Sequence, residues 1–512
     1  MTSENNKRIL KNTLMLYCRM MLTMLVTLYT SRVILNTLGV EDFGIYNVIG
    51  GVVAMFSFLN TAMASGTQRF LSYELGRNDL VQFRKVFSIT LTIHIGIAII
   101  ILLLAETIGL WFLNTRINIP VERMEAARWI FQFSTLSFLV TVIQAPYNAS
   151  IIAYEHMSAY AYVSIIEVIL KLLIVFILTW ASYDKLKLYS VLMFAVIFIT
   201  VAIYRFYCKK KFKGCDYYFV WDRAMYLKLL GYASWNLFGS FAYIGFTQGI
   251  NILLNIFFGP VVNAARAVAY QVNLSIQTLA GNFQLAANPQ IIKSYAADDK
   301  NHMMELIFQS SRYSFYLLLL FSLPMFLEAE MVLKAWLKIV PDYTSLFCRL
   351  IIINAMIDCV SCPLTTAAQA TGIIKKYQAV VGSVLLLNVP VSYLFLRFGF
   401  SPEVTIYVSI VLSAVALFFR LLILRNLINL SIRHFIMRVV VASFLVGLVA
   451  SLIPSMLRLH MIETHYRFFI VCLVAVLSSL LSVYFIGLNS SEKNFILKRI
   501  ATLFNQIKLL KT

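Results

Sequence analysis

The sequence predicts an all-α, polytopic membrane protein with about fourteen transmembrane helices, and three observations lead to this prediction. The chain of 512 residues is 60% hydrophobic and 13% charged, whereas soluble domains are about 45–50% apolar and about 25% charged. About fourteen apolar runs reach the roughly 20 residues that cross a bilayer. These runs are also too long and too uniformly apolar for the alternating strands of about 10 residues that build a membrane barrel.

In chain order, the apolar runs begin near residues 13, 44, 86, 127, 158, 187, 229, 262, 306, 345, 377, 404, 436 and 466. The first run follows a polar and basic stretch, residues 1–12. It is too long for the apolar region of a signal peptide, and no small-residue cleavage site follows it. We therefore expect it to be retained as the first transmembrane helix.

The distribution of positive charge predicts the topology. With a cytoplasmic N terminus, about 28 Lys and Arg residues fall on cytoplasmic segments and about 11 on external ones, as the positive-inside rule requires. We expect a multi-pass protein with both termini in the cytoplasm. The net charge of +20 then indicates topology and contact with the headgroups of membrane lipids, and no nucleic-acid partner is expected.

Three stretches of the first half recur in the second half, in the same order and about 217–222 residues later. They pair residues 35–48 with 255–268, 67–73 with 289–295, and 145–160 with 362–377. This register predicts an internal duplication. Six helices per repeat return the chain to its starting side, so the two lobes are expected to be related by a pseudo-twofold axis along the membrane normal, around a central cavity.

The duplication predicts the domain boundaries. The last two helices have no counterpart and are read as an addition. The expected parts are an N-terminal six-helix lobe (1–208), a basic cytoplasmic linker (209–228), a C-terminal six-helix lobe (229–430), additional helices thirteen and fourteen (431–490), and a basic cytoplasmic tail (491–512).

Polar side chains form one-sided stripes on three of the expected helices, because they recur at spacings of three and four. Such stripes either hold helices together or line a water-filled vestibule, and their presence at matching places in both lobes favours the vestibule. The stripes comprise Asn47, Gly51, Ser57, Thr61, Ser65 and Gln68; Asn236, Ser240, Tyr243, Thr247, Asn251 and Asn255; and Asn263, Arg266, Tyr270, Asn273, Gln277, Gly281, Gln284 and Asn288.

Charged groups inside the membrane are costly and mark candidate sites. Arg19 lies about two turns into helix 1, where it either lines the cavity or extends to the interface. Glu167 and Lys171 are four residues apart on helix 5, which permits an ion pair. That pair is either structural or functional, with Lys171 contacting an anion or Glu167 coupling protonation to transport. Asp358 in helix 10 is a second candidate for coupling.

The expected interior is rich in cations and amides, which suits an anionic ligand with many hydroxyl groups. The candidate substrate-binding residues are Arg19, Lys171, Asn251, Asn255, Arg266, Tyr270, Asn273 and Gln277. A cation or drug pump would instead use a lone carboxylate, and helix 1 has none. No catalytic residue, cofactor or metal site is expected: there is no Walker A loop, and Cys359 and Cys362 form a lone pair without histidine partners.

The sequence resembles the polysaccharide flippase family, the O-antigen and capsule exporters of bacterial inner membranes. This family belongs to the multidrug/oligosaccharidyl-lipid/polysaccharide exporter superfamily, together with drug/sodium antiporters and the lipid II flippase. The resemblance covers essentially the whole chain, and its specificity comes from the order of its motifs. These are SRVILNTLG (31–39), EDFGIYNVIGG (41–51), SGTQRFLSYELGR (65–77), ANPQIIKSYA (287–296) and ATGIIKKY (370–377).

The resemblance implies a V-shaped bundle of six plus six helices that alternates between inward- and outward-facing states, as in the drug-antiporter (MATE) fold. It also implies a Wzx-like function: moving an undecaprenyl-pyrophosphate-linked oligosaccharide across the inner membrane for surface polysaccharide biosynthesis. Polymerase or assembly proteins would be its partners. Arg19, Lys171 and Arg266 would contact the anionic headgroup. The drug-antiporter branch carries a carboxylate in helix 1, from which this chain departs.

Two other functions stay open. One is cation-coupled multidrug export. The other is a membrane glycosyltransferase or polymerase of the same pathway, which would need an acid/base or metal site in a sizeable external loop. The longest external loop, residues 113–129, has no paired carboxylates of obvious catalytic spacing. We therefore expect a transporter and not an enzyme.

Overall fold

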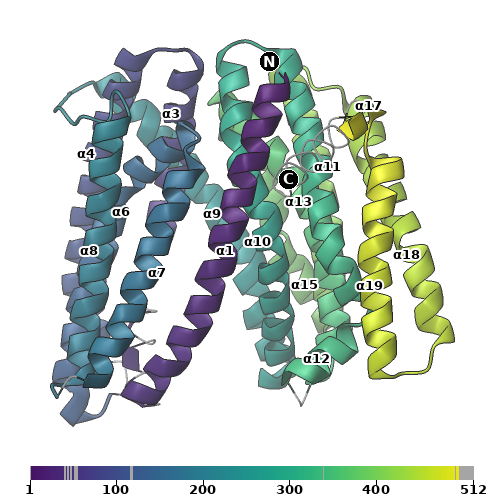
Figure 1. Cartoon of the computed structure of the whole chain (residues 1–512), viewed down its shortest axis with the longest axis horizontal. Coiled ribbons are helices and arrows are strands. Elements are labelled where there is room, and N and C mark those ends of the chain that lie inside the picture. Colours follow the sequence, from purple (N-terminus) through teal and green to yellow (C-terminus); the bar gives the residue numbers. More distant parts are fainter. Residues whose placement is uncertain are drawn as a thin grey trace, which may run out of the picture. The chain divides into compact units, whose positions relative to one another are not determined.

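The computed structural model describes residues 2–39, 42, 45, 46, 49, 50, 53, 56–115, 119–180, 182–337, 340–490 and 492–494. All regular secondary structure in these residues is helical (Figure 1). Of the residues singled out from the sequence, Asn47 and Gly51 lie outside the described part of the chain, as does the expected tail apart from residues 492–494.

The first half of the chain is a series of long helices joined by short turns. In order they are α1 (Thr2–Leu38), α3 (Ser57–Gly76), α4 (Leu80–Leu104), η1 (Ala105–Gly109), α5 (Leu110–Thr115), η2 (Val121–Arg123), α6 (Met124–Ala153), α7 (Met157–Trp180) and α8 (Lys185–Lys211). Side-chain caps start two of them: Asp79 accepts a hydrogen bond from the Gln82 amide, and Asp184 accepts from the amides of Leu186 and Lys187.

The second half repeats this pattern and adds two further helices. Its elements are α9 (Arg223–Phe258), α10 (Pro260–Ala296), α11 (Lys300–Leu327), α12 (Ala329–Leu337), α13 (Thr344–Thr371), α14 (Lys375–Leu386), α15 (Asn388–Arg397), α16 (Val404–Ile428), α17 (Ile432–Phe435), η3 (Ile436–Val441), α18 (Ala442–His460), α19 (His465–Ser482) and η4 (Val483–Gly487).

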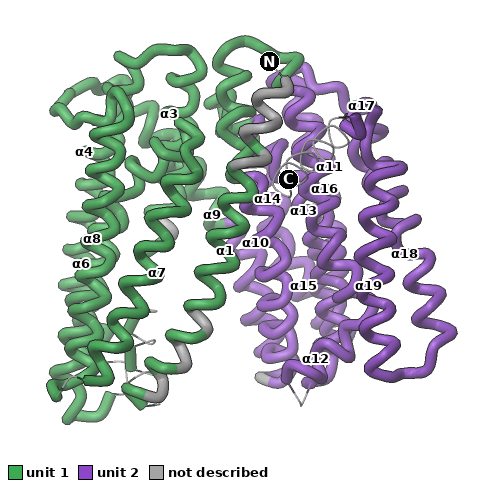
Figure 2. Tube along the Cα trace, in the orientation of Figure 1, with its two compact units in different colours: residues 1–241, 285–303, 368–379 green, residues 242–284, 304–367, 380–512 purple. Residues whose placement is uncertain are grey.

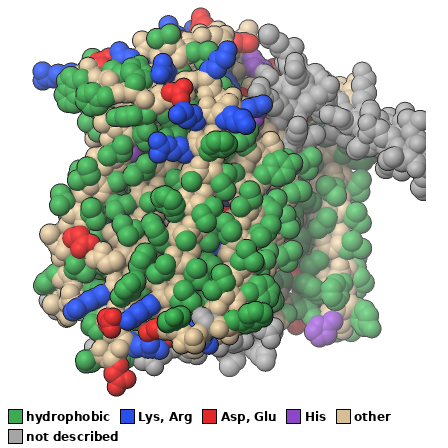
Figure 3. Space-filling view, turned by 60° about the vertical axis from the view of Figure 1, so that its left-hand side comes forward, with side chains coloured by type: hydrophobic (Ala, Val, Ile, Leu, Met, Phe, Trp, Pro, Cys, Tyr) green, Lys and Arg blue, Asp and Glu red, His purple; other side chains and the backbone are tan. Residues whose placement is uncertain are grey.

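Among the described residues, eleven helical stretches are long and apolar enough to cross a membrane. Of the three remaining apolar runs, those that begin near residues 13 and 262 lie in the long helices α1 and α10. The run that begins near residue 44 lies largely outside the described residues and continues into α3. On the face shown in Figure 3, hydrophobic side chains form a band, and charged side chains gather at its two ends. The predicted fold class, an all-α polytopic membrane protein, is confirmed.

The chain divides into two compact units (Figure 2). Unit 1 comprises residues 1–241, 285–303 and 368–379, and unit 2 comprises residues 242–284, 304–367 and 380–512. Unit 1 therefore includes two short segments from the second half of the sequence. The repeat boundaries expected from the sequence describe the duplication, and they remain a prediction.

Left-handed backbone recurs at matching places in the two halves. The pairs are Gly39 and Gly259, Asn78 and Asp298, and Glu155 and Gly372, with φ values of 85° and 77°, 56° and 56°, and 60° and 76°. A positive φ is uncommon outside glycine, so three such pairs at nearly constant separation support the internal duplication.

The last two long helices, α18 and α19, pack on α11 within unit 2. Apolar contacts join Tyr316 and Leu323 of α11 to Val446 and Val471. Buried ion pairs act at both ends of this contact. Arg467 pairs with Glu328 at 3.1 Å, and Arg312 pairs with Glu492 at 2.8 Å.

Candidate functional site: a carboxylate-bearing cavity in unit 2

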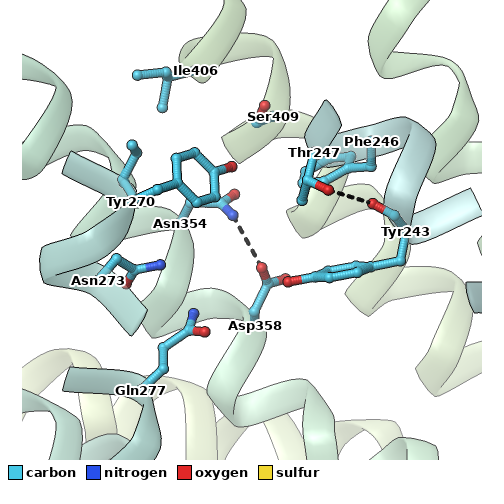
Figure 4. Close-up of a pocket in the computed structure, with 11 residues that line it drawn as sticks. Tyr243, Phe246, Thr247, Tyr270, Asn273, Gln277, Asn354, Asp358, Ile406 and Ser409 are labelled. Carbon is cyan, nitrogen blue, oxygen red and sulfur yellow. Dashed lines mark hydrogen bonds between the residues drawn. The ribbon is translucent and has the colours of Figure 1, made fainter. Parts of the chain in front are cut away.

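Unit 2 contains a small polar cavity enclosed by four helices (Figure 4). Its volume is about 20 Å³, enough for one water molecule or a comparable ion. The lining residues are Tyr243, Phe246 and Thr247 of α9; Tyr270, Asn273 and Gln277 of α10; Ile351, Asn354 and Asp358 of α13; and Ile406 and Ser409 of α16.

Helical periodicity places these side chains. Tyr270, Asn273 and Gln277 follow one another at spacings of three and four on α10, so they share one face. Asn354 and Asp358 are four residues apart on α13 and point into the same space (Figure 4). The cavity is therefore a product of two facing polar stripes.

Asp358 is the only carboxylate among the residues that line this cavity. Its Oδ2 accepts a hydrogen bond from Asn354 Nδ2 at 3.0 Å, and the ring of Tyr243 points toward it (Figure 4). A charged carboxylate inside a membrane protein is costly unless it is paired, protonated or bound to a cation. Asp358 is therefore the group of this cavity lining that can bind a proton or a cation.

Two amide oxygens in the cavity lining have no donor among the described residues. Among the described residues, no hydrogen-bond partner reaches Asn273 Oδ1 or Asn354 Oδ1, although both atoms are buried. Buried acceptors in native proteins are almost always satisfied. Oxygens of carboxylates, amides and hydroxyls are also the ligands that hard cations prefer. The lining thus suits a bound cation, a hydronium ion or a water molecule that donates to these oxygens.

Arg266 lies on the same helix as Asn273, but it is used within the protein. Its side chain is buried, donates to Asn251 Oδ1 and to the Thr247 carbonyl (3.0 Å), and lies 4.3 Å from the centroid of the Tyr270 ring. Through Thr247 and Tyr270 it fixes two residues that line the cavity. The geometry therefore assigns Arg266 a positioning role beside the cavity.

A second buried group supports the other wall. Asn388, at the start of α15, donates to the carbonyl of Phe246 at 3.1 Å and to Ser409 Oγ at 3.0 Å. It thereby connects α9 and α16 at two residues that line the cavity. Because Asn388 has no exposed surface, both bonds are shielded from water and hold the wall firmly.

The long polar stripe of α10 serves two purposes. Asn273 and Gln277 face the cavity. One turn or more further on, Gln284 donates to Ser314 Oγ at 3.1 Å and to the Cys359 carbonyl at 3.3 Å, so it joins helices. One part of the stripe thus lines the small cavity and another part joins helices, and the water-filled vestibule expected from the sequence stays a prediction.

The candidate charges of the first half lie in unit 1. Arg19 of α1 lies 4.3 Å from the centroid of the Tyr160 ring on α7. Its buried NH1 group has no hydrogen-bond partner among the described residues. On α7, Lys171 Nζ and Glu167 Oε1 form the expected ion pair at 2.6 Å, with each side chain about one-third exposed.

The structure brings together four of the predicted residues, Tyr270, Asn273, Gln277 and Asp358, in one cavity. Arg266 and Asn251 form a bonded pair beside it. Asn251 also donates to Gln248 Oε1 at 2.6 Å. Asn255, one turn further along α9, is exposed.

Three contributors to the cavity were not anticipated: Asn354, Asn388 and Ser409. The spacing of Asn354 from Asp358 was a usable signal, because i,i+4 polar pairs share a face. Asn388 with Ser392 on α15, and Ser409 with Thr405 and Ser413 on α16, also recur at a spacing of four, so the same signal was available for them.

Comparison of the sequence with known proteins finds one weak match. No family model matches the sequence. One curated relative, an uncharacterized membrane protein EpsK of Bacillus subtilis (strain 168), is 22% identical over 291 residues. The match spans 56% of this chain and 56% of that protein, so the chain matches only about half of the relative's length.

Solved structures match over more of the chain. A multidrug resistance MATE family transporter of the MOP superfamily, in an outward-facing conformation, has a TM-score of 0.70 at 14% identity and covers 83% of this chain and 96% of its own. A MOP superfamily transporter from Pyrococcus furiosus has a TM-score of 0.71 at 13% identity, with the same coverage. The MATE transporter ClbM in complex with Rb⁺ has a TM-score of 0.67 at 15% identity, over 84% of this chain and 96% of its own. The chain therefore has the MATE-like fold.

Proposed function

We propose that this protein is an exporter that moves an anionic, lipid-linked oligosaccharide across the bacterial inner membrane by alternating access. The observation that carries the transport proposal is the Asp358 cavity, a polar site within apolar helices of a MATE-like fold. Such a site has a clear use in coupling, because its occupancy changes the electrostatic cost of burying the carboxylate.

Asp358 is the proposed coupling residue. When a proton or cation occupies the cavity, the carboxylate is neutralised and the surrounding helices can close around it. When no ion occupies the cavity, Asp358 keeps only the partial compensation of the Arg420 charge on α16 among the described residues, and the carboxylate favours a conformation in which water reaches it. Differential binding of one ion to two conformations is sufficient to drive a transport cycle.

The cavity in unit 2 is too small for the cargo. A volume of about 20 Å³ holds one small ion or water molecule, whereas a sugar ring has many more atoms. Cargo and coupling ion therefore need separate sites. Arg19 is the proposed cargo contact, because its NH1 group is buried and has no hydrogen-bond partner among the described residues, and guanidinium groups recognise pyrophosphate oxygens.

A second candidate function is cation-coupled multidrug export. The lone carboxylate of the cavity favours it, because a cation-coupled pump needs such a group. One similar structure is titled as a multidrug resistance transporter. The two candidates share the coupling site and differ in the cargo.

Transport in reconstituted vesicles distinguishes the two candidates. A fluorescent undecaprenyl-pyrophosphate oligosaccharide and a cationic dye are offered separately, with and without Na⁺ and H⁺ gradients. Under the main proposal, only the lipid-linked sugar moves. Asp358→Asn removes its gradient dependence, and Arg19→Gln lowers its flux at least about tenfold. The matched controls are Glu305→Gln and Arg205→Gln, which change exposed residues of α11 and α8.

The outcomes are separable. Movement of the dye alone, abolished in Asp358→Asn and retained in Arg19→Gln, would favour multidrug export. If Asp358→Asn responded to both gradients as the wild type does, the coupling role of the cavity would be wrong.

A further inference from the structure

At one end of unit 1, helix ends from both halves of the sequence meet. They belong to α1, α3 and α6 of the first half, and to residues 285–303 and 368–379 of the second half. Two buried polar junctions connect these segments. Neither contains a residue of the proposed coupling or cargo sites.

The first junction is centred on Glu155, which follows the C-terminus of α6. Its carboxylate accepts hydrogen bonds from Gln290 and Lys293 of α10, and its backbone carbonyl accepts from Asn12 of α1 at 3.1 Å. The side chain of Glu155 is only 1% exposed. A carboxylate so buried is stable only while its partners remain in contact.

The second junction is centred on Arg69 of α3. Its Nε donates to the carbonyl of Gln369 at 3.0 Å, and its NH2 donates to the carbonyl of Ala370 at 2.7 Å. These carbonyls belong to the last turn of α13, where the helix dipole is negative; the Gln369 carbonyl also accepts from the Gly372 amide at 3.0 Å. The guanidinium is buried and also lies 4.6 Å from the centroid of the Tyr73 ring.

The two junctions occupy equivalent positions in the duplicated sequence. Glu155 corresponds to Gly372, and both have left-handed backbone at a helix end. Lys293 lies two residues after the position that matches Arg69, within the stretch 289–295 that pairs with 67–73. In each junction, a cation on the second helix of one repeat reaches the end of the fourth helix of the other repeat.

Close packing fills the space between the junctions. A Cβ added at Gly76 of α3 would lie 2.7 Å from Ala296 Cβ and 2.8 Å from the Lys293 backbone of α10. The rings of Tyr73 and Tyr295, at matching positions, have centroids 6.4 Å apart. The segments of the two halves are thus in direct contact along this seam.

We propose that these two junctions form a paired ionic latch that holds this end of the protein closed and opens as a unit. The latch comprises Glu155 with Gln290 and Lys293, and Arg69 with the carbonyls of Gln369 and Ala370. Its charges are fully partnered when closed, and water solvates them when the end opens. A buried ion pair gains little over its hydrated state, so the closed and open states of the latch are close in free energy and the latch opens reversibly, as a two-state transport element requires.

Thiol labelling measures the opening directly. Ser65→Cys places a reporter at the second junction, where the native hydroxyl accepts a hydrogen bond from Gln369 at 3.4 Å. The seven native cysteines are replaced, and the full chain is held in lipid nanodiscs. The rate of reaction with a polar maleimide then reports how often this seam opens, with no cargo present.

Removing a latch charge should accelerate labelling. In Glu155→Gln, Lys293→Gln and Arg69→Gln, we expect the rate to rise roughly tenfold or more, because each leaves a partner charge or helix end unsatisfied. The charge-reversed pair Glu155→Lys with Lys293→Glu should return the rate toward that of the parent. Lys300→Gln is the matched control: it removes an exposed ion pair with Asp298 at the same end, within a single turn, and should leave the rate unchanged.

Several results would overturn the latch. One is equal labelling in the single variants and in the Lys300→Gln control. Another is a charge-reversed pair that folds and labels as fast as the single variants. If a single variant fails to fold, as judged by its thermal unfolding, the charge-reversed pair decides alone. Because the assay uses no cargo, failure of the latch is distinct from failure of the proposed transport.

Discussion

The buried ion pair between Glu328 and Arg467 provides a sharp test of how α19 is held in unit 2. The two side chains are 2% and 6% exposed, so Glu328→Gln would leave the Arg467 guanidinium buried without its main counter-charge. Breaking such a pair costs about 3–5 kcal/mol. Arg467 keeps Glu463, four residues earlier, at 3.3 Å, so we expect a loss near the lower limit, about 3 kcal/mol.

Glu463 supplies the matched control on the same arginine. Its side chain is 68% exposed, and exposed pairs contribute about 0–1 kcal/mol. Replacing both Glu328 and Arg467 by leucine should cost less than Glu328→Gln alone, since no charge is then left unpaired. The free energy of unfolding is measured by SDS titration in mixed micelles, followed by circular dichroism. A Glu328→Gln loss no larger than that of Glu463→Gln would refute the reasoning.

Two further predictions concern the loops. Gly372→Ala should destabilise the protein more than Gly399→Ala. Both glycines have left-handed backbone, which costs about 1–2 kcal/mol for alanine. Only at Gly372 would the new Cβ also lie 2.8 Å from an Arg69 nitrogen. Equal shifts of the thermal midpoint in the two variants would contradict this prediction. The ion pair with Lys85 holds the pKa of Asp222 below its ordinary value, so Lys85→Gln should lower the thermal midpoint at neutral pH. This difference should vanish as the pH falls through the pKa of Asp222, because the protonated group no longer attracts Lys85.

The fold class could be predicted from the sequence because the signal for a transmembrane helix is local. Each transmembrane helix needs one apolar run, and the runs are readable without knowing their neighbours. Left-handed turns were readable at Gly39 and Gly259, where glycine marks them. At Glu155 the same conformation is adopted by a charged residue, and the sequence gives no local sign of it.

The candidate site could be predicted in part. Periodicity predicts that Tyr270, Asn273 and Gln277 share one helix face, and all three line the same cavity. Partners on other helices depend on packing, which periodicity does not encode. The bond from Asn388 to Ser409 is of this kind, because spacing indicates which face of α15 and of α16 is polar and does not indicate that these two faces meet.

The correspondence between Glu155 and Gly372 has a genetic consequence. Two of the four glycine codons become glutamate codons through a single base change. In a chain that arose by duplication, one such change at the α6 end would exchange a freely adopted turn for a carboxylate that meets Lys293. One base change would therefore give the two copies of this turn different roles. The copy at Glu155 supplies a charge, and the copy at Gly372 leaves room for Arg69.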